Sequence, residues 1–170
     1  MKIHILKEFE EFVPQKFTEN PIQYYQERGT PFRTGEILID EAGVVQDDPT
    51  AVRFFPVWKN GVLSLHVVAK KINLKKAKQI ETKDPLYEWK ILEKVCELNL
   101  PCAKPVGWIE QEGEYIILTE RLEGDHFEKF KDLDQSIVNK FHLAMDKMKE
   151  QYEKHGIERN WYLKDMVVTY

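Results

Sequence analysis

The clearest β pattern of the chain lies between residues 52 and 72. Two runs rich in β-branched and aromatic residues, AVRFFPVW and VLSLHVVAKKI, flank Asn60-Gly61. Asn-Gly tolerates the positive φ angles of a type I′ turn, so these runs predict a β-hairpin. An earlier short run, Glu36–Asp40, predicts another strand. The polar loop AGVVQDDPT separates that strand from the hairpin.

Helical spacing follows the hairpin. Asp84-Pro85 has the form of an N-cap followed by proline at the first helical position. The next segment, LYEWKILEKVCELN, places its apolar residues on one broad side, which predicts a helix. A longer helix is expected from about Asp134 to Lys154, with Gly156 just past its end. One face of that helix carries five residues: Ile137, Phe141, Ala144, Met148 and Tyr152.

The remaining elements are shorter. Two strands, VGWIEQ and EYIILTERL, are expected around a turn at Glu112-Gly113. Asp125 has the position of a cap for a short helix in HFEKF, and MVVTY predicts a final strand. Short helices broken by Pro14, Pro21 and Gly29 are expected in the first 30 residues. Together, these elements predict an α+β fold: a mostly antiparallel sheet with one packed helix, followed by a minimal helical C-terminal piece.

Composition narrows the class of protein. Hydrophobic residues make up 42% of the chain and charged residues 32%, which is ordinary for a globular protein. A formal charge of −4 gives no global field for nucleic acid, so a nucleic-acid partner is not expected. No apolar run approaches the roughly 20 residues of a membrane span. The N-terminus lacks a signal-peptide pattern, and the two cysteines lack a metal-binding spacing. A reduced, cytoplasmic setting is therefore expected.

Three segments give the sequence a resemblance to the protein-kinase-like superfamily. They are HVVAKKI, YEWKILEKV and EYIILTERLEG, in that order. The likeness is closest to atypical bacterial and archaeal branches, such as the lipopolysaccharide heptose kinases and small atypical Ser/Thr kinases. In that superfamily a strand lysine contacts the nucleotide's α- and β-phosphates and pairs with a glutamate on the next helix. The resemblance therefore implies either Lys70 or Lys71 for the lysine, and Glu88 for the glutamate.

The resemblance also implies a division of the chain. Residues 1–31 would be a lead segment, residues 32–122 a kinase-like N-lobe, and residues 123–170 a truncated C-lobe. The backbone around Glu120 and Leu122 would face adenine. ATP and Mg²⁺ are thus the implied cofactors. The loop AGVVQDDPT has one glycine and two adjacent aspartates, where the family has a glycine-rich phosphate loop. That departure weakens the case for ordinary ATP binding and leaves open whether the protein binds either cofactor.

The segment HGIERNWYLKDMVV occupies the place of the family's catalytic loop. Alignment on Arg159 puts Asn160 where the family has its catalytic aspartate, and an amide cannot accept a proton at neutral pH. The same alignment puts Asp165 where the family has a metal-binding asparagine, and Asp165 could bind Mg²⁺. The sequence given stops at Tyr170, before any Asp-Phe-Gly segment. We therefore expect the scaffold of an active site without its chemistry.

The resulting hypothesis is a degenerate, pseudokinase-type protein that acts as a binding or regulatory module. Phe141 and Met148 would contact a protein partner or a second copy of the chain, because large exposed apolar faces are rarely tolerated. One alternative is an ATP-dependent phosphotransferase, either atypical or part of a longer enzyme. A second is an unrelated small α+β protein, which a large separation between Glu88 and both lysines would favour.

Overall fold

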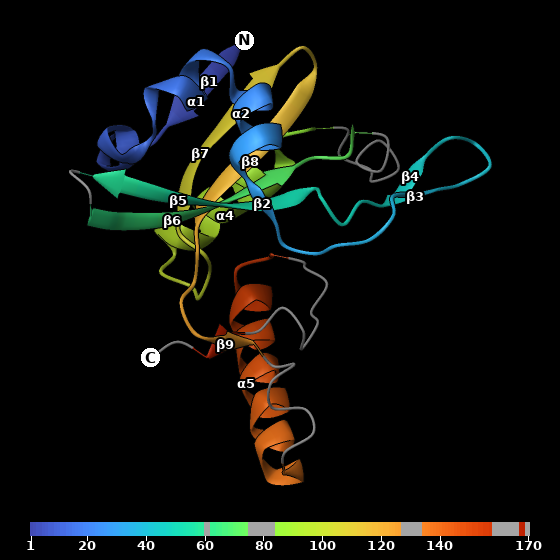
Figure 1. The fold of residues 1–170 in the computed structure, drawn as a ribbon. Helices are drawn as coiled ribbons and strands as arrows, with labels where there is room; N and C mark the ends of the chain where they lie inside the picture. The colour runs from blue at the N-terminus through green and yellow to red at the C-terminus, as the bar shows by residue number, and fades with distance from the viewer. Residues whose placement is uncertain (60–61, 75–83, 127–133, 158–166, 169–170) are drawn as a thin grey trace. The chain divides into compact units, whose positions relative to one another are not determined.

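The computed structural model describes residues 1–59, 62–74, 84–126, 134–157 and 167–168. The chain divides into two compact units, drawn in Figure 1. The first unit comprises Met1–Leu92 and Ala103–Arg121, and the second comprises Glu93–Cys102 and Leu122–Tyr170. Both helices and antiparallel strands are present, so the fold is α+β, as the sequence predicted.

A six-stranded sheet forms the centre of the first unit, with the order β1-β7-β8-β6-β5-β2. Each neighbouring pair is antiparallel. In this spatial order the strands span Lys2–Ile5, Pro105–Gln111, Glu114–Glu120, Val62–Lys71, Val52–Lys59 and Thr30–Pro31.

Both predicted hairpins are present in this sheet. Lys59 of β5 pairs with Val62 of β6, which confirms the first hairpin, although its Asn60-Gly61 turn lies outside the described residues. The second hairpin joins β7 to β8 through Glu112 and Gly113, whose φ angles are 54° and 80°. Positive φ at both central residues is the mark of a type I′ turn, so the predicted turn is confirmed.

The main core lies between one face of the sheet and the N-terminal helices. These are the 3₁₀-helix η1 (Lys7–Phe12), α1 (Gln15–Glu19) and α2 (Pro21–Arg28). Their aromatic residues Phe9, Phe17 and Tyr25 are buried together with Phe55 and other residues of the sheet. Burying one such side chain stabilises the folded state by about 1.5–3 kcal/mol. The aromatic residues of the N-terminal helices thus help to form the core of the sheet.

Residues 1–31, which the sequence set apart as a lead segment, also contribute two strands. β1 pairs with β7, and β2 pairs with β5. The approach of β1 requires a glycine on β7, since a Cβ at Gly107 would collide with the backbone oxygen of His4 and with the Ile5 side chain. The expectation of helices alone in this region was therefore incomplete.

Helix α4, Tyr87–Glu97, begins close to the predicted cap. The Asp84 carboxylate accepts a hydrogen bond from the backbone N–H of Leu86 at 2.9 Å and pairs with Lys90. The hydrogen bond from Lys90, followed by that from Leu86, lowers the pKa of Asp84 below its usual value. Trp89 is buried, and its ring meets the His4 ring edge-on at 5.7 Å.

In the second unit the long helix α5 spans Gln135–Lys154. Asp134 caps it by accepting a hydrogen bond from the N–H of Ser136 at 2.8 Å, and Gly156 follows it with a φ of 65°. The predicted helix is therefore confirmed. Tyr152 is buried and donates its hydroxyl to the carbonyl of Pro101 at 2.7 Å. Ala144, expected on the apolar face, is exposed.

Two short strands complete the second unit as described. β9, Asp125–His126, pairs antiparallel with β10, Val167–Val168. β10 confirms the predicted final strand. The interpretation of Asp125 as a helix cap was wrong, because His126, which would begin that helix, is paired with Val167 in a strand. Most of the proposed short helix, residues 127–133, lies outside the described residues. No helix in the described part of the chain is long and apolar enough to cross a membrane.

Candidate functional site

A cleft of about 670 Å³ opens on the first unit. We call it the Lys70 cleft. Its walls come from β4 (Val45–Asp47), the residues that follow β4, the end of β6, the first turn of α4 and the β7–β8 turn. All of these segments belong to the first unit. The cleft therefore brings together residues from distant parts of the sequence.

The predicted pair of Lys70 and Glu88 lies in the wall of this cleft. The Lys70 Nζ atom donates to both carboxylate oxygens of Glu88, at 2.7 and 2.9 Å. Side chains alternate along a strand, so Lys70 points away from the face on which its neighbour Ala69 is fully buried. Glu88 lies in the first turn of α4, close to the end of β6.

This ion pair contributes little to stability. The side chains of Lys70 and Glu88 are 47% and 44% exposed, and ion pairs exposed to this extent contribute about 0–1 kcal/mol. Its effect is to orient Lys70. A lysine held by two hydrogen bonds retains a third N–H donor, because an ammonium group has three.

Lys71 has a different partner. It forms an ion pair with Glu114, which begins β8. The sequence left open which lysine meets Glu88, and the structure assigns that contact to Lys70. The large separation that would have favoured an unrelated fold is not observed. Sequence reasoning missed Glu114, since the pairing of β6 with β8 across an intervening helix leaves no local signal.

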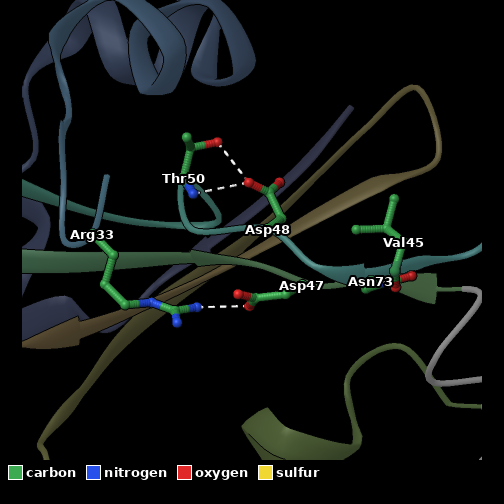
Figure 2. Close-up of polar contacts among 6 residues, drawn as sticks. All are labelled: Arg33, Val45, Asp47, Asp48, Thr50 and Asn73. Atoms are coloured by element: carbon green, nitrogen blue, oxygen red, sulfur yellow. Dashed lines mark hydrogen bonds and ion pairs between the residues drawn. The ribbon is translucent and has the colours of Figure 1, made fainter. Parts of the chain in front are cut away.

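Short polar contacts organise another part of the cleft lining (Figure 2). The Arg33 guanidinium donates to the Asp47 carboxylate at 2.7 Å. Asp48 accepts hydrogen bonds at 2.8 Å from both the N–H and the hydroxyl of Thr50. The side-chain amide of Asn73 donates to the carbonyl of Val45 at 2.8 Å. The two adjacent aspartates of this loop are thus each engaged by the surrounding chain.

The charges that line the cleft nearly balance. Three basic residues face four acidic ones, and they are Arg33, Lys70, Lys71, Asp47, Asp48, Glu88 and Glu114. Such a surface can position a polar ligand through Lys70, but it does not concentrate anions as a basic pocket would. Within the described ranges no cluster of three or more His, Cys, Asp or Glu residues could hold a metal ion.

The segment expected to face adenine is partly engaged by its own chain. The N–H of Glu120 donates to the carbonyl of Lys104, and the N–H of Arg121 donates to the carbonyl of His66, both at 2.8 Å. These two N–H groups are therefore not available to a base. Leu122 belongs to the second unit, and its side chain is exposed.

The predicted catalytic-loop residues Arg159, Asn160 and Asp165 lie outside the described residues. The two residues expected to contact a partner have different environments. Phe141 is only 8% exposed, and Met148 is half-buried. Because Phe141 is already buried in the chain, its side chain offers little accessible surface to a partner in this structure.

Comparison with known proteins gives no match: no family model, no curated protein and no solved structure matches this chain. The kinase-like likeness therefore rests on the motifs of the sequence. The contact between Lys70 and Glu88 is consistent with that likeness.

Proposed function

We propose that this protein is a degenerate, kinase-like binding module of pseudokinase type. In this proposal the Lys70 cleft takes up a nucleotide as a signal, and the chain responds by binding a partner instead of transferring phosphate. The observation that carries the proposal is the double hydrogen bond from Lys70 to Glu88 at the edge of an open cleft. A lysine and glutamate in this relation position nucleotide phosphates in kinases.

The order of the elements supports the same proposal. A strand hairpin carrying the lysine is followed by a helix carrying the glutamate, and then by a second strand hairpin that joins the same sheet. The resemblance places Asn160 where proton transfer from a substrate hydroxyl needs a carboxylate. The scaffold for holding phosphates is thus proposed to persist without the base for transferring them.

Nucleotide binding is tested by thermal unfolding of the wild type and of Lys70→Met in Mg-ATP. A nucleotide at about 100 times its dissociation constant stabilises a protein by roughly 2.7 kcal/mol. We expect the wild type to gain stability and Lys70→Met to gain much less. Lys71→Met is the matched control, since Lys71 has its own partner in Glu114 and should leave the gain intact. An equal response in all three proteins would contradict the proposed role of Lys70.

The absence of transfer is tested separately by following γ-phosphate from labelled ATP into protein and into free phosphate. We expect neither product above the level given by Lys70→Met. Turnover that Lys70→Met abolishes would replace the binding proposal with catalysis. If millimolar nucleotide does not stabilise the protein, the proposal that the Lys70 cleft binds a nucleotide is wrong.

An ATP-dependent phosphotransferase is the second candidate. One observation favours it: the Lys70 contact to Glu88 is fully formed, as active kinases require. The decisive variant is Asn160→Asp, which supplies a carboxylate at the proposed base position. Transfer by the wild type that Asn160→Asp accelerates would support this candidate, whereas inactivity of both proteins would support the binding module.

A further inference from the structure

The hairpin formed by β3 (Leu38–Ile39) and β4 exposes an apolar strand. Ile37, Leu38 and Ile39 are 49%, 57% and 60% exposed, whereas the described aliphatic residues of the six-stranded sheet are buried or half-buried. Figure 1 shows the hairpin extending away from that sheet, within the first unit. Three consecutive exposed aliphatic residues do not contribute to the core, so their presence suggests an interaction surface.

One edge of the hairpin is open for pairing. In the part of the chain that the structure describes, β3 pairs with β4 alone. The side of β4 is occupied, because Asn73 donates to the carbonyl of Val45 and Arg33 pairs with Asp47. An edge strand with unpaired backbone groups is a template for another strand. The outer edge of β3 is therefore the docking edge.

The hairpin is also preorganised. The Asp40 carboxylate accepts hydrogen bonds from the N–H groups of Ala42 and Val44, at 3.0 and 2.8 Å. It also accepts from the side-chain amide of Gln46 at 2.7 Å. These contacts fix the connection between β3 and β4. Less conformational freedom is then lost when a partner strand docks.

The charge of this region selects the partner. Residues 33–48 contain five acidic residues and one basic residue, a net charge of −4 that equals the formal charge of the whole chain. The rest of the chain is therefore balanced. The single basic residue, Arg33, is already paired with Asp47. Glu36 and Asp40 place a negative charge at each end of the apolar strand, so a complementary strand carries basic residues at both ends.

A second copy of the chain does not fit this edge. If two β3 strands paired antiparallel about Leu38, Glu36 of each copy would face Asp40 of the other. If they paired parallel, each acidic residue would lie beside its own counterpart. Like charges directly opposite each other destabilise a sheet pair. Self-pairing is thus opposed in both orientations.

We propose that β3 binds an extended segment of a partner protein by strand addition. The segment has three apolar residues between two lysines or arginines, so that its basic ends meet Glu36 and Asp40 and its apolar residues cover Ile37–Ile39. Backbone hydrogen bonds supply affinity in this binding mode, and side chains supply specificity. This inference rests on the proposed binding function, for which it names a surface and a class of partner.

The test uses three nine-residue peptides and the whole chain, without nucleotide. GSKVIVKSG has the proposed pattern, GSEVIVESG reverses its charges, and GSKVPVKSG places a proline in the strand, which removes a backbone donor. We expect GSKVIVKSG alone to shift the backbone amide resonances of residues 36–40, with an affinity that weakens as salt is raised. Equal shifts with all three peptides, or shifts confined to the Lys70 cleft, would overturn the proposal.

A charge exchange sharpens the test. Glu36→Lys should weaken binding of GSKVIVKSG by roughly fivefold and improve binding of GSEVIVESG, since each cross-strand charge pair contributes up to about 1 kcal/mol. Glu10→Lys is the matched control, an equal charge change at an exposed position on η1, and it should alter neither affinity. Self-association of the wild type in sedimentation would favour a second copy as the occupant. Peptide binding is measured without nucleotide. A lack of peptide binding can therefore be distinguished from a lack of nucleotide binding in the Lys70 cleft.

Discussion

On β6, Val67 and Ala69 are buried against the N-terminal helices, whereas on β3, Leu38 and Ile39 are largely exposed. The six-stranded sheet gains stability by removing apolar surface from water. The β3–β4 hairpin is instead ordered by polar contacts around Asp40 and by the pairing of Arg33 with Asp47. The comparison shows that an apolar side chain in a strand does not by itself reveal its purpose. Burial separates residues that maintain the fold from residues available for recognition.

Truncation of a buried side chain in the core of the sheet should cause the largest loss of stability. Phe55 is buried, and its ring stacks on the ring of Tyr24 with 5.6 Å between the ring centroids. We expect Phe55→Ala to lower the free energy of unfolding by roughly 3–5 kcal/mol, measured by urea denaturation. Phe54→Ala on the same strand is the control. Phe54 is half-buried on the other face, so its loss should cost clearly less. Equal losses would show that the core does not lie where the structure places it.

Steric crowding between β1 and β7 should cause the second-largest loss of stability. An added Cβ at Gly107 would meet the Ile5 side chain at 2.7 Å, as well as the backbone oxygen of His4. We expect Gly107→Ala to cost about 1–3 kcal/mol, as overpacking commonly does. Hydrogen exchange should show faster exchange in β1, with β5 and β6 less affected. Unchanged protection of β1 would indicate that the strand moves aside at no cost.

A smaller effect is expected at a buried hydroxyl. Tyr25 donates to the carbonyl of Thr50 at 2.9 Å, and burial raises the pKa of Tyr25 to about 12. The unfolded chain loses this proton near pH 10, at a lower pH than the folded chain. The neutral hydroxyl therefore contributes stability below pH 10 that is lost as the pH rises toward 12.

The corresponding variant is Tyr25→Phe. Removal of the hydrogen bond should cost about 1 kcal/mol at neutral pH. The difference between the wild type and Tyr25→Phe should then shrink between pH 10 and pH 12 in parallel denaturation experiments. A constant difference across this range would contradict the raised pKa.

The hairpin should give the smallest effect on stability. Leu38→Thr replaces an exposed aliphatic side chain with one that is also well suited to a strand. We expect its free energy of unfolding to change by less than about 0.5 kcal/mol, as is usual for exposed positions. Binding of GSKVIVKSG should nevertheless weaken. A loss of stability as large as that of Phe55→Ala would remove the distinction between the two regions.

Local signals were enough to predict the hairpins, the capped start of α4 and the long helix. Asn-Gly and Glu-Gly turns, Asp84 and Gly156 each act over a few residues, so the sequence shows them directly. The expected contact to Glu88 was predicted from the resemblance. The choice between Lys70 and Lys71 was not, because HVVAKK has no simple alternation of apolar and polar residues that would assign either lysine to a face.

Long-range pairing could not be predicted in the same way. Lys2–Ile5 is only four residues long, and the polar run KEFEEF follows closely. Nothing local indicates that β1 adds to β7 at the far end of the unit. The exposure of Ile37–Ile39 could not be predicted either, since a short apolar strand can have the same residue types in a core or on a surface. Interpretation of Asp125 as a cap failed because its strand partner, Val168, is distant in sequence.

The position of β1 has a consequence for how the chain is made. Lys2 pairs with Glu110, so β1 leaves the ribosome well before its partner strand, which emerges only after most of the first unit has been synthesised. At about 5–20 residues per second, roughly 5–20 s pass before that partner emerges. During this interval the Ile3 and Ile5 side chains have no sheet to cover them.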